Sequence, residues 1–289
     1  MWNQYLTPIS LKEALQFTEQ YQERARILAG GTDLVLDFSS QRLAPVEAVI
    51  DISCIPELKK IDLQSGIITI GTAVTLTELI ASDLLKNSAP ILVVAARQIA
   101  GPQIRNVATL GGNVVNASPA ADMIPALLVL DSLVSIIHFS GKARQVSLEA
   151  FLLGNRKVDL SNGEIVTGFS FSLPDPATQH YFRKVQPRRS MAIAMLNLAM
   201  FVKVEDQKIA QLKIAMGAVA PTAVRVKSVE RELKNTPIQN AVNPERYAGI
   251  SQDIFPITDF RASREYRLRV ARNLLREAIL ELVKSTKSG

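Results

Sequence analysis

The chain has 289 residues, of which 47% are hydrophobic and 21% are charged. This composition supplies a substantial core, argues against a disordered chain, and fits one large domain or two ordinary ones. The net charge of +6 comes from lysines and arginines that are spread widely, and no basic patch studded with aromatic residues favours nucleic-acid binding.

Cys54 is the only cysteine. One thiol cannot form an internal disulfide, a cysteine-rich zinc site or an iron–sulfur cluster within this chain alone. The first residues lack the basic start and apolar stretch of a signal peptide, and the longest apolar segment, 124–137, contains Asp131 and is too short to span a bilayer. We therefore expect a soluble, cytoplasmic protein with no membrane span.

The first 55 residues predict a compact βαβ-type unit. Ser10 and Glu13 match a capping box at the start of a helix over 11–22. A strand at 25–28, a glycine turn, a short helix and a strand at 46–52 follow, in the order typical of such a unit.

Residues 56–176 predict a mixed set of elements. These are a strand at 67–71, a short helix capped by Thr75 and Glu78, a buried apolar helix at 88–100, a buried helical turn at 125–130, and strands at 133–139 and 164–173. Their order favours an α+β architecture over a regular parallel winding.

Pro174 and Pro176 bracket a turn residue and mark the expected domain boundary. Beyond it, three strands (180–186, 194–204, 208–217) and two helices (about 222–234 and 262–284) predict a three-stranded antiparallel sheet with helices on one face. The arginines between residues 261 and 276 alternate with apolar residues, which is typical of the solvent-facing side of a helix.

Two glycine pairs are the most informative features of the chain. Gly30-Gly31 and Gly111-Gly112 each follow a short apolar run and precede a polar residue, Thr32 or Asn113. Residues without a Cβ can turn sharply and point backbone N–H groups into one concavity. Each pair alone is compatible with plain loop geometry, but the two together predict a dinucleotide whose diphosphate is held from both sides.

The common catalytic signatures are absent from the sequence. The Rossmann fingerprint Gly-x-Gly-x-x-Gly does not occur, and Gly141 with Lys142 lacks the other residues of a P-loop. His138 and His180 are the only histidines, too few for a histidine zinc site or a serine–histidine triad. The chemistry must therefore come mainly from a bound cofactor.

The segments around both glycine pairs resemble a known family. RILAGGTDL at 26–34 and QIRNVATLGGNVVNASPAAD at 103–122 are similar to the flavoprotein (medium) subunit of the molybdenum hydroxylases, the xanthine dehydrogenase and carbon monoxide dehydrogenase family. Further matches lie at 164–167, at 182–184 with Arg188 and Arg189, and at 217–222, so the resemblance covers nearly the whole chain.

The resemblance implies an α+β fold with two domains. Residues 1–176 would form a two-lobed FAD-binding domain of the vanillyl-alcohol oxidase or p-cresol methylhydroxylase type, with lobes at about 1–55 and 56–176. Residues 177–289 would form the C-terminal domain of the carbon monoxide dehydrogenase flavoprotein type, with a three-stranded antiparallel sheet and helices.

The resemblance also implies which residues contact FAD. Carried over by position, they are Ile27, Leu28, Ala29, Gly30, Gly31, Thr32, Asp33, Leu34, Ile99, Thr109, Leu110, Gly111, Gly112, Asn113, Asp122, Val166 and Lys184.

Physical roles can be assigned to some of these residues as hypotheses. The Asp122 carboxylate suits ribose or ribityl hydroxyls, or equally caps the helical turn that follows. The Lys184 ammonium would favour a reduced, anionic flavin, unless it is a solvated strand residue. Ile99 and Val166 would pack against the flavin ring or belong to the core.

One position departs from the family pattern. After the double arginine, the family usually has two residues and then aspartate, isoleucine and alanine, whereas Ala192 occupies the aspartate position here. Any ion pair or cofactor contact made by that aspartate is missing here. We therefore expect the geometry around Arg188 and Arg189, on the electron-acceptor side, to differ from that of the family.

The resemblance implies an FAD-binding electron-transfer subunit. A large partner subunit would carry molybdopterin and oxidise the organic substrate, a small partner subunit would carry two [2Fe–2S] clusters, and FAD on this chain would pass electrons to NAD or another acceptor. The alternatives are a non-catalytic assembly or structural subunit of such a complex, supported by Ala192, and a stand-alone flavin reductase.

Overall fold

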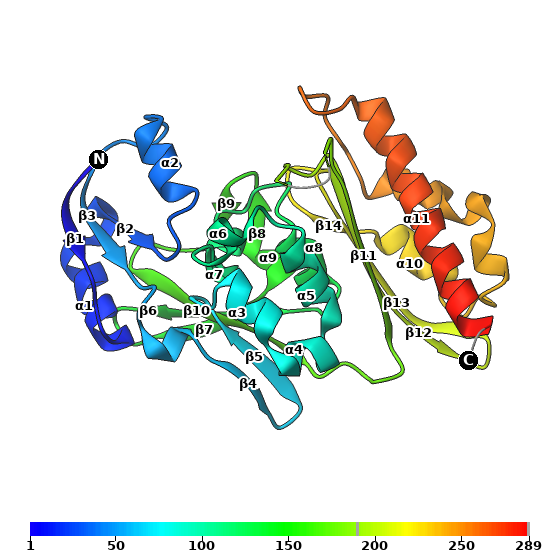
Figure 1. Cartoon of the computed structure of the whole chain (residues 1–289), viewed down its shortest axis with the longest axis horizontal. Coiled ribbons are helices and arrows are strands. Elements are labelled where there is room, and N and C mark those ends of the chain that lie inside the picture. The colour runs from blue at the N-terminus through cyan, green and yellow to red at the C-terminus, as the bar shows by residue number, and fades with distance from the viewer. Residues whose placement is uncertain (189–190, 288–289) are drawn as a thin grey trace. The chain divides into compact units, whose positions relative to one another are not determined.

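The structure is a computed structural model of the whole chain and describes residues 1–188 and 191–287 (Figure 1). The chain forms two compact units that are not consecutive in sequence. The first comprises residues 1–86, 100–117 and 131–173, and the second comprises 87–99, 118–130 and the chain from 174 onward. The predicted boundary at 176/177 therefore assigns residues 87–99 and 118–130 to the first domain, although they pack with the second unit.

The first unit begins with a small parallel sheet. Its strands are β1 (Trp2–Leu6), β3 (Val46–Asp51) and β2 (Ala25–Leu28), in that order. α1 (Leu11–Tyr21) is capped by Ser10, whose Oγ accepts from the backbone N–H of Glu13 at 3.2 Å. The predicted capping box is only half formed, because the Glu13 carboxylate accepts from the N–H of Ile9 at 2.8 Å. Strand β1 was not predicted, because it is an edge strand whose residues do not alternate between buried and exposed.

A five-stranded antiparallel sheet forms the rest of the first unit. Its order is β4 (Ile61–Gln64), β5 (Ile67–Gly71), β10 (Glu164–Ser172), β6 (Leu133–His138) and β7 (Ala143–Ser147). α3 (Leu76–Ala81) begins with the predicted capping box: Glu78 N–H donates to Thr75 Oγ1 at 3.2 Å, and Thr75 N–H donates to the Glu78 carboxylate at 2.8 Å.

Short elements connect these sheets. They are η1 (Gln22–Arg24), α2 (Leu34–Ser39), η2 (Pro56–Leu58), α4 (Asp83–Ser88), α6 (Pro102–Arg105), α7 (Leu110–Val115), α9 (Leu148–Phe151), β8 (Leu152–Gly154) and β9 (Lys157–Val158). The apolar helix predicted at 88–100 is shorter than expected. α5 (Pro90–Arg97) starts at Pro90 because the first helical position needs no N–H donor.

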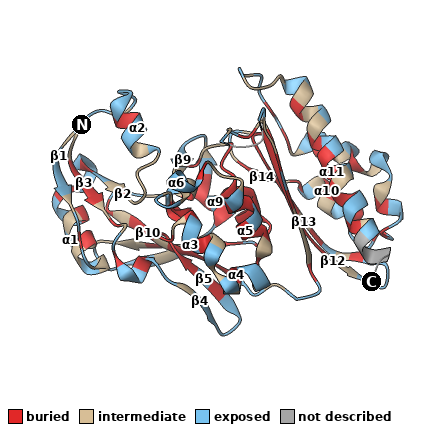
Figure 2. Ribbon diagram, viewed as in Figure 1, coloured by how far each residue is buried: buried red, intermediate tan, exposed pale blue. Residues whose placement is uncertain are grey.

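The second unit is built on a four-stranded antiparallel sheet. Its strands are β11 (Gln179–Val185), β12 (Leu196–Glu205), β13 (Lys208–Gly217) and the short β14 (Val224–Arg225), which was not predicted. One face packs against α10 (Lys227–Leu233), η3 (Asn240–Val242), η4 (Pro244–Gln252) and α11 (Arg264–Lys287), as Figures 1 and 2 show.

Helices also cover the other face of this sheet, which corrects the expectation of helices on one face only. α5 contacts β11, and α8 (Met123–Leu128) contacts β12 and β13. Side chains alternate along a strand, so Leu196 and Leu198 enter the core with α11, while Asn197 and Ala199 face the opposite side and are also buried. Both faces therefore need a covering layer.

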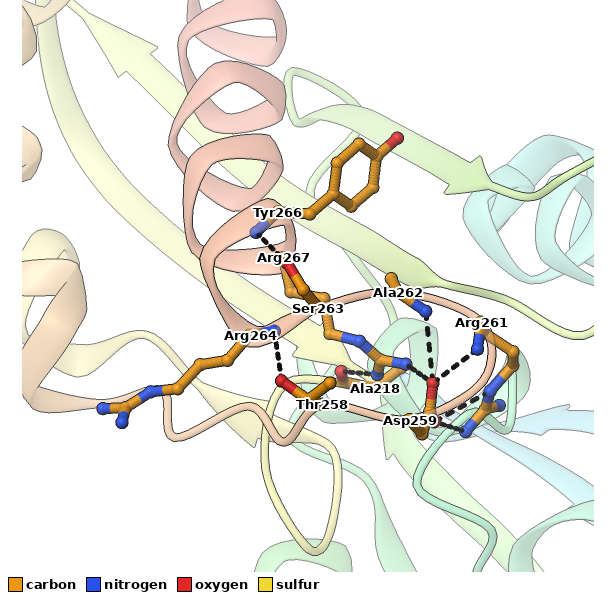
Figure 3. Close-up of polar contacts among 9 residues, drawn as sticks. All are labelled: Ala218, Thr258, Asp259, Arg261, Ala262, Ser263, Arg264, Tyr266 and Arg267. Atoms are coloured by element: carbon orange, nitrogen blue, oxygen red, sulfur yellow. Dashed lines mark hydrogen bonds and ion pairs between the residues drawn. The ribbon is translucent and has the colours of Figure 1, made fainter.

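Arg267 corrects a second expectation. Within the basic segment of α11, Arg269, Arg272 and Arg276 are exposed as predicted, but Arg267 is only 2% exposed. Its guanidinium donates to the carbonyl oxygen of Ala218 and to Asp259 Oδ1, both at 2.7 Å (Figure 3). This arginine is a buried structural group and not part of a solvated face.

Candidate functional site

The first glycine turn joins β2 to α2 and needs a glycine at both positions. Gly31 has φ +68°, a conformation that L side chains rarely adopt. A Cβ on Gly30 would lie 1.9 Å from the carbonyl oxygen of Val107 and 2.9 Å from Cα of Ala108. These contacts are with backbone that cannot move aside, so the turn lies directly against the segment that enters the second glycine pair.

The first turn has backbone donors without protein partners. Among the described residues, the N–H groups of Gly30, Gly31, Thr32 and Asp33 donate to no acceptor. A backbone N–H that is neither paired nor solvated costs free energy comparable to a lost hydrogen bond. Successive free N–H groups in such a turn form a concavity that suits an anion such as a phosphate.

The second glycine pair is organised differently. Thr109 caps α7, and its Oγ1 accepts from Gly112 N–H at 3.0 Å, while Gly111 N–H donates to the carbonyl oxygen of Thr72 at 2.9 Å. A Cβ on Gly111 would lie 1.9 Å from Thr72 Oγ1. The expectation that both turns offer free N–H groups is therefore wrong for Gly111 and Gly112, whose donors are used within the chain.

Gly112 is the exception to this tight packing. It is exposed, and a Cβ there would meet only Thr109 Oγ1, at 3.1 Å. Since the described protein gives no strong reason for a glycine at this position, its small size is available for the close approach of a ligand.

A buried ion pair lies in the second unit. Lys184 Nζ donates to Asp122 Oδ2 at 2.7 Å and to the carbonyl oxygen of Gln98 at 3.0 Å. Asn197, fully buried on β12, donates from Nδ2 to Asp122 Oδ1 at 2.8 Å. Both carboxylate oxygens of Asp122 are thus occupied by donors from the sheet.

The structure excludes one alternative for each residue of this pair and leaves their predicted contacts with FAD as predictions. The Asp122 side chain makes no capping bond to α8, although it stands at the N-cap position. Lys184 is 8% exposed, so it is not a solvated strand residue. Burial raises the pKa of Asp122, and the charge of Lys184 and the amide of Asn197 oppose that rise.

The remaining predicted contacts, Val166 and Ile99, belong to different units. Val166 is buried on β10, in the first unit, where the register of the sheet shifts between Val166 and Gly168. Ile99 is half-buried just after α5, in the second unit. Val166 is thus buried, whereas Ile99 is half-buried, and both stay predicted neighbours of the flavin.

The segment that departs from the family pattern is only partly described. Arg188 Nη2 donates to the carbonyl oxygen of Met191 at 2.5 Å, and Ala192 is half-buried. Arg189 lies outside the described residues. This bond joins Arg188 to the residue directly before Ala192, which occupies the position of the family aspartate.

Asn197 and Gln98 were missed by the sequence reasoning. Gln98 contributes only a backbone carbonyl oxygen, which no sequence pattern reveals. Asn197 had a signal: it is a single amide in the otherwise apolar run from Leu196 to Val202, on the face opposite to Leu196 and Leu198.

In the described part of the chain, no helix is both long enough and apolar enough to cross a membrane. In the same residues, no three side chains of histidine, cysteine, aspartate or glutamate gather in a way that could hold a metal ion.

Comparison with known proteins assigns both parts of the chain. Residues 2–175 match the family model described as the FAD binding domain in molybdopterin dehydrogenase, and residues 180–282 match the CO dehydrogenase flavoprotein C-terminal domain.

Similar full-length proteins support this match. The chain is 33% identical over 265 residues to the xanthine dehydrogenase FAD-binding subunit of Escherichia coli, covering 90% of this chain and 89% of that one. It is 28% identical over 277 residues to the carbon monoxide dehydrogenase medium chain of Hydrogenophaga pseudoflava, covering 96% and 95%.

A solved structure extends the likeness to the fold. Carbon monoxide dehydrogenase from Hydrogenophaga pseudoflava, in a form that lacks the Mo-pyranopterin moiety of the molybdenum cofactor, contains a chain that superposes with a TM-score of 0.90 at 26% identity, covering 96% of each chain. The turns, the sheets and these matches together place this chain in the family of FAD-binding flavoprotein subunits of the molybdopterin-dependent dehydrogenases.

Proposed function

We propose that this chain holds FAD and transfers electrons from the [2Fe–2S] clusters of a small partner subunit to NAD or another acceptor. The organic substrate would be oxidised at a molybdenum centre on a large partner subunit. The observation that carries the proposal is the first glycine turn. Its N–H groups from Gly30 to Asp33 have no acceptor among the described residues, and a Cβ on Gly30 would overlap the backbone of the segment that enters the second turn.

The diphosphate would be bound by the first turn. The N–H groups of Gly30 to Asp33, which have no acceptor among the described residues, would donate to phosphate oxygens. Asp33 opposes this anion, because its carboxylate is exposed beside the same turn. The flanking residues of the proposed FAD site are Ile27, Leu28, Ala29 and Leu34.

The second turn would line the cofactor and support the first. Gly111 fixes the turn against Thr72, and exposed Gly112 leaves room for close approach. Thr109, Leu110 and Asn113 complete this part of the proposed site, and Ile99 and Val166 would be the apolar neighbours.

Asp122 and Lys184 would act as a neutral pair and not as a lone cation. With Asp122 Oδ2 at 2.7 Å, the ammonium of Lys184 is largely compensated, so its influence on the charge of a bound flavin is reduced. The ammonium group of Lys184 has three N–H donors, of which two bond to Asp122 and Gln98. The third would be able to donate to a cofactor oxygen. The redox chemistry itself belongs to FAD, which exchanges electrons singly or in pairs when bound.

Spectroscopy of the purified complex tests this proposal. We expect about one FAD per chain from flavin absorbance, and reduction of that flavin when the substrate of the complex is added. A colourless chain that assembles normally would instead identify a structural subunit. Flavin reduction by a nicotinamide donor, with no partner chain present, would identify a stand-alone reductase.

A matched pair of variants tests the site. Gly31→Ala and Gly141→Ala both place a methyl group on a residue with positive φ, +68° and +83°. The Gly141 methyl would enter open space, whereas the Gly31 methyl would meet Leu28 and Val35 at 3.3 Å. Only Gly31→Ala should lower the FAD content, by about tenfold. Equal FAD content in both variants would reject this turn as the diphosphate site.

A further inference from the structure

The helix that follows the first glycine turn carries a buried acid with two arginine partners. Asp37, on α2, is only 5% exposed. Arg42 Nη1 donates to Asp37 Oδ1 at 3.2 Å, and Arg156 Nη1 donates to Asp37 Oδ2 at 2.7 Å. Arg42 lies five residues further along the same segment, whereas Arg156 is 119 residues away, in the turn between β8 and β9. Only the second partner therefore connects α2 to a distant part of the chain.

Arg156 joins two segments that belong to the two glycine turns. Its guanidinium reaches α2, which follows the first pair. Its backbone N–H donates to the carbonyl oxygen of Ala117 at 3.1 Å, two residues beyond the end of α7, and α7 carries the second pair in its first turn. All of these segments belong to the first unit. One residue thus ties the helix after the first turn to the end of the helix of the second.

α2 and the first glycine turn are continuous. Val35 N–H donates to the carbonyl oxygen of Gly31 at 3.0 Å, and Asp37 N–H donates to that of Asp33 at 2.9 Å. α2 has only six residues, and so short a helix is not stable by itself, so its place depends on side-chain anchors. Holding Asp37 therefore also holds the turn whose N–H groups have no acceptor among the described residues.

The backbone of Arg156 indicates that its side chain is needed. The residue has φ +55°, in a hairpin turn, where glycine would adopt this conformation without strain. An arginine keeps a backbone strain that glycine would avoid, and such strain persists only where the surroundings require it. The bond to Asp37 is what the arginine supplies and a glycine could not.

The cavity beside α2 offers an alternative role for this arginine, as part of a separate anion site. The charged residues that line the cavity are Asp33, Asp37, Arg42 and Arg156. Two arginines alone would favour an anion, but two aspartates offset them, so the formal charges of the lining cancel. The charges therefore favour an internal tie over a second ligand site.

We propose that Arg156 is a positioning residue for FAD: through Asp37 it ties α2 to the end of α7, so that the N–H groups from Gly30 to Asp33 are in place before the diphosphate binds. Arg156 acts through Asp37 and makes no contact with the phosphates. A site that is ordered in advance binds more tightly, because less conformational entropy is lost on binding. This inference rests on the proposed function, because FAD is the ligand that the turn would hold.

Titration of the purified full-length chain with FAD tests the proposal. Arg156→Ala should raise the Kd for FAD about tenfold, because the turn must be ordered on binding. The variant should fold, since Arg42 still pairs with Asp37. The matched control, Arg42→Ala, removes the other partner of Asp37 without breaking the tie and should change the Kd less than about twofold.

Three further variants separate positioning from other roles of Arg156. Asp37→Ala should raise the Kd as much as Arg156→Ala, and the double variant should add less than about twofold, because the tie is already broken. Arg156→Lys keeps the ion pair and should stay within about threefold of the wild type. Arg156→Gly relieves the strained φ but should lose affinity as Arg156→Ala does, which a role in hairpin stability alone would not produce.

Amide hydrogen exchange of the FAD-free chain measures the tie without the cofactor. Arg156→Ala should speed exchange of the N–H groups of Val35 and Asp37, whereas Arg42→Ala should not. Unchanged exchange in Arg156→Ala would overturn the proposal, and so would an unchanged Kd in a chain that binds FAD. Multiplying effects of Arg156→Ala and Asp37→Ala would also overturn it, in favour of direct contact with phosphate. A wild-type chain that binds no FAD would defeat the proposed function, and the exchange rates would then decide alone whether Arg156 holds α2.

Discussion

The two glycine pairs look alike in sequence but serve different physical purposes. In the first, the close approach of Val107 O and a φ of +68° leave no alternative to glycine, and the N–H groups remain without protein partners. In the second, Gly111 fits against Thr72 and the N–H groups of both glycines are used inside the chain. A glycine pair thus indicates a tight backbone, whereas only an account of each donor shows which turn can bind an anion.

The largest expected effect separates the two turns. In Gly30→Ala the methyl group would overlap Val107 O, so the two segments must move apart. We expect FAD affinity to fall more than about 100-fold, roughly 3 kcal/mol. Flavin retained after ultrafiltration measures this, and Gly66→Ala, which has φ +77° and open space around it, is the control. Full retention in Gly30→Ala would mean that the contact between the turns does not shape the site.

Gly111→Ala should act on stability first. Its methyl would lie 1.9 Å from Thr72 Oγ1 and 2.6 Å from Thr72 O. We expect the free energy of unfolding in urea to fall by about 2–3 kcal/mol. Because this turn offers no free N–H group at Gly111, the folded fraction should bind FAD within about threefold of the wild type. Normal stability with lost FAD would make the two turns equivalent after all.

Gly112→Ala should show the opposite pattern within the same pair. The position is exposed and a methyl group meets only Thr109 Oγ1, so the free energy of unfolding should change by less than about 0.5 kcal/mol. If FAD approaches closely here, its affinity falls about tenfold, or 1.4 kcal/mol. Isothermal titration of the apo-chain with FAD gives the value, and an unchanged affinity would remove Gly112 from the site.

The smallest effect concerns pH. Partial burial raises the pKa of Asp33, and the charge of Arg156 opposes that rise. The ionised carboxylate repels a phosphate at the first turn, so FAD affinity should increase as the pH falls through this pKa and the charge is lost. The gain should be a few-fold, since the group is only partly buried and solvent and salt screen its charge. Asp33→Asn should bind FAD more tightly at pH 7 and lose the pH dependence; a parallel dependence in both proteins would contradict this.

Much of the fold could be predicted from the sequence because local rules determine it. The capping residues Ser10 and Thr75 begin helices where the sequence places them, and the strands β2, β3 and β5 follow their apolar runs. What failed depends on tertiary context. An apolar helix such as α5 can cover any sheet, so its sequence could not indicate that it packs on β11 in the second unit.

The candidate site was predictable to a similar degree. Both turns were found because glycine pairs constrain the backbone in any fold. The pairing of Asp122 with Lys184, 62 residues away, could not be read from periodicity, and neither could the use of Gly111 N–H by Thr72. Arg267 was wrongly predicted to be solvent-exposed. Helical periodicity shows which residues share a face, but it does not show that a buried acceptor, here Ala218 O, lies within hydrogen-bonding distance of an arginine.

The interleaved units have a consequence for how the chain is made. The polypeptide passes from one unit to the other after residues 86, 99, 117, 130 and 173. During synthesis, α5 and α8 leave the ribosome well before β11, β12 and β13, whose sheet they cover. These two helices have no sheet to pack against until most of the chain has been synthesised. A fragment that ends at residue 176 would therefore leave two apolar helices exposed and would be prone to aggregation.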